Sequence, residues 1–255
     1  MRYFIHLAYE GTNYHGWQKQ VNGVSVQEKL NFSVSCILNE HIVTMGCGRT
    51  DAGVHATDFY AHFDTDKELD EKFTFRLNSV LPKDIRVFKV FQVTQNAHAR
   101  FHAKSRTYEY FIHQHENGFI RNFSTKIHNR EMDWDLVIEA TKLIPMFKDF
   151  TSLCRASEDF STNLCNVTEA RWDKIIRPAV AGAGTDEFMR FTITSNRFLR
   201  GMVRKIVGAL ILIGRHRLTI EDFQKTVEAK EQFKFALTSP PQGLYLTKVR
   251  YPNID

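Results

Sequence analysis

The residues whose types and spacing best suit catalysis lie in one glycine-rich segment, residues 46–56. It reads Gly-Cys-Gly-Arg-Thr-Asp-Ala-Gly-Val-His-Ala, and its three glycines permit a tight, irregular backbone. Arg49, Asp51 and His55 are the polar side chains of interest in this segment, which we expect to form a loop between two strands. A carboxylate on such a loop, close to an arginine, can serve as an acid, a base or a nucleophile. Composition alone favours a simpler interpretation, in which Asp51 caps the backbone in an Asx turn.

Two other kinds of site are disfavoured here. The segment lacks the lysine and the hydroxyl residue of a phosphate-binding GxxxxGK[ST] loop. A strand through residues 58–62 would place Asp58 and His62 on one face, near His55 in the sequence, but it supplies no third ligand. We therefore predict that the chain has no metal site.

Residues 99–110 interleave cations with aromatic rings, among them Arg100, Lys104, Arg106 and Tyr108. Cations can neutralise phosphates while aromatic rings stack on bases, so the pattern suits RNA binding. An exposed strand edge with solvated charges explains it equally well. The loop of residues 9–20 is similarly ambiguous, because its polar and aromatic residues suit either RNA contact or a surface loop pinned by Trp17.

A third basic cluster consists of Arg197, Arg200 and Arg204, which are spaced three and four residues apart, as on one stripe of a helix. Most such stripes face water. This one continues into the apolar residues 206–213, so we expect Arg204 to be partly buried. A buried arginine needs a carboxylate partner.

The elements that must position these segments form an α+β pattern in two halves, residues 1–104 and 105–255. The tetrapeptide Tyr-Phe-Ile-His at residues 3–6 recurs at residues 110–113, and each copy opens a similar series of elements. Periodicity predicts strands at residues 3–9, 42–45, 59–63, 85–93, 108–113, 167–174, 188–194 and 244–251. It also predicts two helices that begin after the capping residues Ser25 and Thr219. Three further helices are predicted at residues 71–80, around residues 134–144 and at residues 198–213. The strands could form one antiparallel sheet backed by helices.

The bulk properties are those of a globular protein that can build a core. Of 255 residues, 43% are hydrophobic and 25% are charged, and the net charge of +5 permits a polyanionic partner without requiring one. The four cysteines form no C-x-x-C pair, so we expect free thiols in a reducing compartment. The longest apolar run, residues 206–213, is too short to span a bilayer, and the N-terminus does not resemble a signal peptide. The cytoplasm is the expected location, with no membrane partner.

Together these segments resemble the bacterial-type tRNA pseudouridine synthase A family, whose members isomerise uridines on the 3′ side of the anticodon stem-loop. The resemblance runs from Tyr9 to Tyr251, in the expected order and spacing. The motifs that carry it are Tyr14-His15-Gly16-Trp17-Gln18, Gly48-Arg49-Thr50-Asp51-Ala52-Gly53-Val54-His55-Ala56, Ser105-Arg106-Thr107-Tyr108, Met202-Val203-Arg204 with Gly208, and Gly243-Leu244.

The resemblance implies two ferredoxin-like halves that share a mainly antiparallel sheet, with a catalytic cleft between them. It implies that Asp51 is the essential aspartate, that Tyr108 stacks on the target uracil and that Arg204 pairs with Asp51. The implied substrate-binding residues are Arg49, which helps to open the stem and hold the displaced nucleotide, together with Tyr108, Leu244 and His55. It further implies a homodimer that binds one tRNA across both subunits and modifies uridines 38 to 40.

The chemistry of this reaction is consistent with those residues. The enzyme must break the bond from ribose to N1 of uracil, turn the base and rejoin it through C5, without redox change or group transfer, so no cofactor is expected. A paired uridine must be flipped out at a cost of a few kcal/mol, and stacking on Tyr108 can return about 1–3 kcal/mol. Asp51 must be ionised, which is a reason to place a cation beside it. Attack on the sugar, attack on the base and removal of the C2′ proton all remain open to it.

Two rival functions are weaker. A non-catalytic tRNA-binding protein would not need a carboxylate, which repels phosphate. An aspartate-dependent glycosidic hydrolase would usually carry a second carboxylate as acid, and the loop around Asp51 offers only Asp58.

Overall fold

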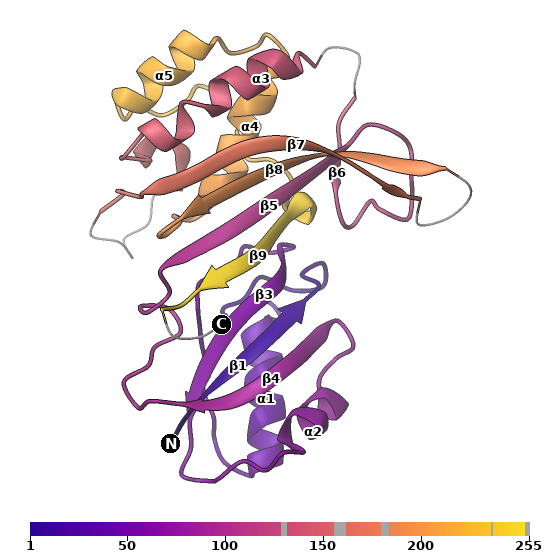
Figure 1. The fold of residues 1–255 in the computed structure, drawn as a ribbon, viewed down its shortest axis with the longest axis vertical. Helices are drawn as coiled ribbons and strands as arrows, with labels where there is room; N and C mark the ends of the chain where they lie inside the picture. The colour runs from indigo at the N-terminus through magenta and orange to yellow at the C-terminus, as the bar shows by residue number, and fades with distance from the viewer. Residues whose placement is uncertain (129–131, 156–161, 180–183, 236, 253–255) are drawn as a thin grey trace. The chain divides into compact units, whose positions relative to one another are not determined.

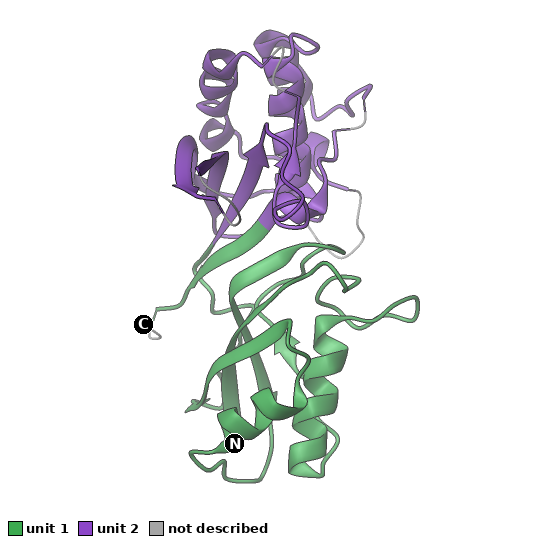
Figure 2. Ribbon diagram, turned by 90° about the vertical axis from the view of Figure 1, so that its right-hand side faces the viewer, with its two compact units in different colours: residues 1–106, 245–255 green, residues 107–244 purple. Residues whose placement is uncertain are grey.

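The computed structural model describes residues 1–128, 132–155, 162–179, 184–235 and 237–252. The chain forms two compact units (Figure 2): unit 1 comprises residues 1–106 and 245–255, and unit 2 comprises residues 107–244. The sequence divides the chain at residue 105, whereas the compact units also assign residues 245–255 to unit 1. The last strand therefore belongs to the unit that the first strand begins.

Unit 1 is built on four strands in the order β4 (Ile85–Val93), β1 (Arg2–Tyr9), β3 (His55–Asp64) and β9 (Leu244–Arg250). β1 is antiparallel to both β3 and β4, while β3 and β9 are parallel. Strand β2 (Met45–Gly46) adds a short antiparallel pairing to β3. The strand predicted at residues 42–45 is thus shifted, because the backbone N–H groups of Ile42 and Thr44 bond to side chains of helix α1, Ser35 and Asn31, instead of a strand.

Helices α1 (Val26–Leu38) and α2 (Phe73–Val80) pack against this sheet (Figure 1). The predicted cap of α1 is confirmed, since the Ser25 side chain accepts the N–H of Glu28 at 3.2 Å. The register that pairs Ile5 with Ala61 and Leu7 with Phe59 puts these apolar residues in the core of unit 1.

Unit 2 contains the strand order β5 (Ser105–His113), β8 (Thr185–Ser195) and β7 (Val167–Pro178). β7 and β8 form a long antiparallel hairpin, and the short β6 (Thr125–Lys126) runs parallel to β5. Helices α3 (Trp134–Thr141), α4 (Met202–Gly214) and α5 (Ile220–Glu228) gather on one side of β7 and β8 (Figure 1). The described part of the unit also includes 3-10 turns at Ile144–Met146, Thr151–Leu153 and Pro241–Gly243.

The helix predicted over residues 198–213 begins later than expected, at Met202. Gly201 precedes it in the left-handed region, with φ of 69°, which interrupts any helix that would run through it. Arg197 and Arg200 therefore lie outside α4, and the expected stripe of three arginines on one helix is wrong. Thr219, by contrast, caps α5 as predicted by accepting the N–H of Asp222 at 3.0 Å.

The predicted α+β class with a mainly antiparallel arrangement of strands is confirmed. Across the described residues, no helix is both long and apolar enough to cross a bilayer.

Candidate active site

The loop that carries Asp51 connects β2 to β3 in unit 1. Its backbone turns tightly: the N–H of Val54 donates to the carbonyl of Asp51 at 3.2 Å, and Gly53 between them has a φ of 76°. A positive φ is inexpensive for glycine and strained for other residues. The turn leaves Asp51 partly exposed and Arg49 exposed, so the carboxylate is held by a fixed backbone while remaining open to solvent.

A second loop, residues 10–17, packs backbone to backbone on the Asp51 loop. The N–H of Trp17 donates to the carbonyl of Thr50 at 3.3 Å, and the N–H of Gly53 donates to the carbonyl of Tyr14 at 3.2 Å. Gly16 has a φ of 84°, and a Cβ there would collide with the Thr50 carbonyl oxygen. The loop of residues 10–17 and the Asp51 loop, both singled out from the sequence, are therefore packed directly against each other.

Buried side chains also hold these two loops in place. The hydroxyls of Tyr9 and Thr50 lie 2.8 Å apart. The Trp17 ring stacks on Phe59 of β3 with centroids 4.2 Å apart. Tyr14 donates from its hydroxyl to Asp84 at 2.5 Å. The residue directly before Asp51 is consequently held both by its backbone and by its side chain.

His55 lies at the foot of the same loop, where it is 1% exposed. Its Nδ1 accepts the N–H of Gly11 at 3.0 Å, so a neutral ring carries its proton on Nε2. The ring also stacks on Tyr245 of β9, with centroids 4.6 Å apart. These contacts make His55 a support of the loop, and its expected role in binding substrate stays a prediction.

Asp58 and His62, considered as metal ligands with His55, each have structural partners. Asp58 bonds to His6 at 2.7 Å through one carboxylate oxygen and accepts the N–H of Val249 at 2.7 Å through the other. The Nδ1 of His62 accepts the N–H of Ala99 at 3.2 Å. Within the ranges that the structure describes, no group of three or more His, Cys, Asp or Glu side chains is arranged to hold a metal ion.

Unit 2 holds Tyr108, Arg204 and Leu244, which the sequence also singles out. Tyr108 on β5 is 8% exposed and meets Phe198 edge to face, with ring centroids 5.0 Å apart. Leu244 is buried. Arg204 in the first turn of α4 is partly buried, as expected, and its Nε donates to the carbonyl of Ser239 at 2.7 Å.

The contact between Arg204 and Ser239 is reciprocal. The N–H and the hydroxyl of Ser239 both donate to the carbonyl of Arg204, at 3.1 and 2.9 Å. One turn further along α4, a Cβ on Gly208 would collide with the carbonyl of Leu237. The glycine thus allows residues 237–239 to lie directly against the helix and to hold the Arg204 guanidinium. The sequence could not show this role, because it depends on the approach of a distant backbone.

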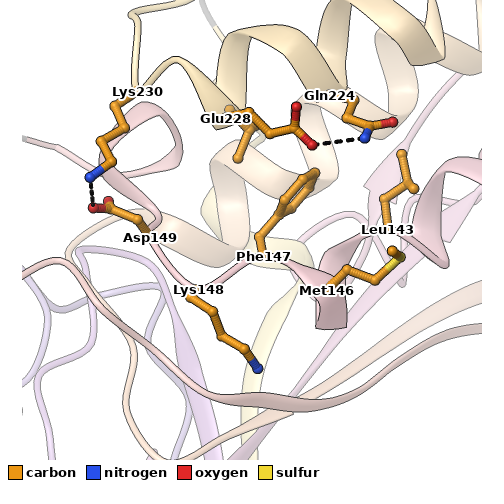
Figure 3. A pocket seen from close by; sticks show the side chains of 9 residues that line it. Leu143, Met146, Phe147, Lys148, Asp149, Gln224, Glu228 and Lys230 are labelled. Atoms are coloured by element: carbon orange, nitrogen blue, oxygen red, sulfur yellow. Dashed lines mark hydrogen bonds and ion pairs between the residues drawn. The ribbon is translucent and has the colours of Figure 1, made fainter.

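A separate pocket of about 250 Å³ lies in unit 2 between the first 3-10 turn and α5 (Figure 3). Its charged groups are engaged with neighbours: Lys230 lies 2.9 Å from Asp149, and Gln224 donates to Glu228 at 2.8 Å. It contains none of the residues that the sequence singles out, and we do not assign it to catalysis. Its lining consists of Leu143, Met146, Phe147, Lys148, Asp149, Gln224, Val227, Glu228 and Lys230.

Comparison with known proteins supports an RNA-modifying function. A family model described as tRNA pseudouridine synthase matches residues 147–252. The tRNA pseudouridine synthase A of Bacteroides thetaiotaomicron is 43% identical over 252 residues, covering 98% of this chain and 91% of its own. Proteins of the same name from Azobacteroides pseudotrichonymphae and Clostridium acetobutylicum are 42% and 37% identical; they cover 99% and 96% of this chain and 97% of their own length in both cases.

Proposed function

The chain belongs to the tRNA pseudouridine synthase family, and from that premise we propose that Asp51 is the carboxylate with which it isomerises uridine in the anticodon stem-loop of tRNA. The enzyme class, an isomerase that forms pseudouridine in tRNA, follows from the family. The catalytic residue, the region of the tRNA and the lack of a cofactor are our proposal.

The observation that carries this proposal is the construction of the Asp51 loop. Bonds from Trp17 and to Tyr14 hold the loop backbone, the Tyr9 hydroxyl holds Thr50, and the carboxylate next to it stays partly exposed. A catalytic group must be positioned by its surroundings and still reach its substrate. The backbone carbonyl of Asp51 closes the turn by accepting the N–H of Val54 at 3.2 Å, so the backbone itself sets the position of the residue.

We assign the remaining roles by matching motifs to the family. Tyr108 would stack on the target uracil, Leu244 would line the base pocket, and Arg204 would provide the cation that pairs with Asp51. Arg49 and His55 would complete substrate binding, Arg49 by holding the displaced nucleotide. Ser239 fixes the Arg204 side chain by accepting from its Nε, which supports a role that depends on a set guanidinium orientation.

The reaction balances without a cofactor. The glycosidic bond at N1 breaks, the uracil turns, a bond from C1′ to C5 forms, and the hydrogen on C5 leaves as a proton while N1 gains one. No electron acceptor or donor is consumed. Asp51 can take part by attacking the sugar, by attacking the base or by removing the C2′ proton.

The same family match is the support for a proposal about partners and location. We propose that the enzyme is a homodimer that binds tRNA across both subunits, that it modifies uridines 38 to 40, and that it works in the cytoplasm, where tRNA is used. Sedimentation of the protein with and without tRNA tests the dimer, and sequencing of the modified tRNA tests the positions.

The decisive experiment uses unmodified tRNA transcripts tritiated at C5 of uridine, incubated with the wild-type protein and with Asp51→Asn, without added cofactor or metal. We expect the wild type alone to release tritium, and we expect Asp51→Asn to keep tRNA affinity within about tenfold, because it removes a charge but little volume. Free uracil among the products would instead identify a hydrolase. Tight tRNA binding without tritium release would identify a non-catalytic binding protein, and a collapse of binding in Asp51→Asn would make Asp51 structural.

A further inference from the structure

A small projecting turn follows the loop that packs on the Asp51 loop. Residues 18–24 leave Trp17, turn back through a β-bridge between Gln20 and Gly23, and lead into Ser25 and α1. At the tip, Val21 is 100% exposed. Single exposed valines are ordinary on protein surfaces. The exposure of Val21 is informative only together with the contacts that hold the turn and the position of its base.

The turn is fastened on both sides. The N–H of His15 donates to the carbonyl of Val24 at 2.8 Å, and the Gln20 side chain donates to the carbonyl of His15 at 2.7 Å. The N–H of Lys19 donates to the buried side chain of Gln27 on α1 at 2.8 Å. Gly23 lies so close to the His15 ring that a Cβ there would collide with it. A turn held by this many contacts presents Val21 in a defined place.

The root of the turn lies on the Asp51 loop. Trp17 bonds to the carbonyl of Thr50, and a Cβ on Gly16 would collide with that carbonyl. Val21 lies four positions after Trp17, and an extended chain spans at most about 3.6 Å per residue, so the tip lies within roughly 14 Å of Trp17, which bonds to the residue next to Asp51. That reach corresponds to a few stacked base pairs at about 3.4 Å each along one strand. Lys19 on the turn and Arg49 on the Asp51 loop are both exposed, so both cations are accessible to phosphates of a bound RNA.

We propose that Val21 is a wedge residue, which enters the base stack of the tRNA stem next to the target uridine as that uridine swings out. The inference rests on the proposed function, since it requires a base to be extruded toward Asp51. A flipped base leaves an unpaired partner and a gap in the stack, and apolar side chains inserted between base steps are a known means of holding a helix open. Val21 would fill the gap while the cations nearby hold the phosphates.

The test compares two tRNA transcripts that differ at one nucleotide. In the first the target uridine is paired with adenosine; in the second the opposing base is cytidine, so the target is already unpaired. We expect Val21→Ser to slow single-turnover tritium release about tenfold on the paired substrate and less than about twofold on the mismatched one, because only the first must be opened. Val21→Leu, which keeps an apolar tip, should stay near the wild-type rate on both.

Val80→Ser is the matched control, because Val80 is an exposed valine of the same unit, 44% exposed at the end of α2. It should match the wild type on both substrates. An equal loss on the two substrates in Val21→Ser, or no loss on either, would overturn the wedge.

A second readout decides the question independently of chemistry. A tRNA with 2-aminopurine opposite the target uridine should brighten when the wild-type protein binds and the target leaves the stack. Loss of that fluorescence increase in Val21→Ser, at saturating protein, supports the wedge. Absence of tritium release from every transcript would count against the proposed function, but it would not affect this result. Undiminished brightening in Val21→Ser would overturn the wedge whatever the enzyme's activity.

Discussion

The hydroxyl of Tyr9 lies 2.8 Å from Oγ1 of Thr50, so the end of the first strand is fastened to the residue directly before Asp51. Both side chains are buried, with 4% and 8% exposure. A hydrogen bond in such a place has few competing waters and leaves a costly unsatisfied group when one partner is removed. This pair of hydroxyl groups therefore links the Asp51 loop directly to the first strand of unit 1.

Tyr9→Phe removes this hydrogen bond while keeping the ring. We expect it to destabilise the protein by about 1 kcal/mol and to lower kcat with little change in KM, since the loop would lose position rather than substrate contacts. Tyr3→Phe is the control: Tyr3 is a buried tyrosine of the same strand whose hydroxyl accepts the N–H of Leu69. It should cost stability without the loss in kcat. Equal kcat losses in both variants would show that the effect comes from stability alone.

Arg204 is expected to matter through both its charge and its orientation. Arg204→Met removes both and should lower the rate at neutral pH about a hundredfold, as when a preorganised electrostatic group is deleted. Arg204→Lys keeps the charge but not the planar guanidinium that bonds to Ser239. Its rate should therefore lie between those of the wild type and Arg204→Met. Arg200→Met removes an exposed cation that lies outside the helix, and should change tRNA affinity more than turnover. Single-turnover rates with separate binding measurements check this, and an unchanged rate in Arg204→Met would exclude the proposed ion pair with Asp51.

Gly208→Ala should be far more harmful than its size suggests. The added Cβ would collide with the carbonyl of Leu237, and backbone must shift to make room. We expect a loss of about 1–3 kcal/mol in the free energy of unfolding, typical of overpacking, together with reduced activity because residues 237–239 also hold Arg204. Gly118→Ala, where a Cβ meets no atom within 4 Å, should change stability by less than about 0.5 kcal/mol. Denaturant titration of both variants distinguishes a steric clash at residue 208 from a general cost of replacing glycine by alanine.

His62 predicts a pH dependence of stability. Burial, with a smaller contribution from the charge of His98, lowers its pKa from 6.5 to about 4. The unfolded chain therefore binds the proton more readily than the folded protein between these values, so stability is full above about pH 6.5 and falls as the pH drops toward 4. The change attributable to His62 is no more than about 3 kcal/mol.

The matched variant for this effect is His62→Gln, which keeps a side-chain acceptor for the N–H of Ala99 but does not titrate. Its stability should vary less with pH between 4 and 6.5 than that of the wild type. A profile as steep as that of the wild type would assign the acid sensitivity to other groups.

Local signals in the sequence were sufficient for much of the fold. The caps at Ser25 and Thr219 were predictable because a capping side chain and its N–H partner lie three residues apart in the chain. The strand Ile85–Val93 was predicted to the residue from its periodicity. The start of α4 was wrong because apolar periodicity does not report the left-handed conformation of Gly201.

The site divides in the same way. Asp51 stood out through its glycine-rich surroundings and the family resemblance, both of which are local. The reasons for Gly16 and Gly208 could not be read from the chain, because each glycine admits a backbone that lies tens of residues away, at Thr50 and at Leu237. Val21 gave no signal either, since an isolated valine in a polar turn is unremarkable until its exposure and its anchoring are known.

The parallel pairing of β3 with β9 has a consequence for how the protein is made. β3 begins at His55, directly after the Asp51 loop, and its partner residues Tyr245 and Leu246 leave the ribosome only after all of unit 2 has been synthesised. At about 5–20 residues per second, that interval lasts on the order of ten seconds. Throughout it the nascent unit 1 carries an uncovered strand edge, the kind of surface that invites pairing with another chain. The Asp51 loop therefore gains the stacking contact between His55 and Tyr245 only after unit 2 has been synthesised, and until then we expect the edge of β3 to be open to pairing with other chains.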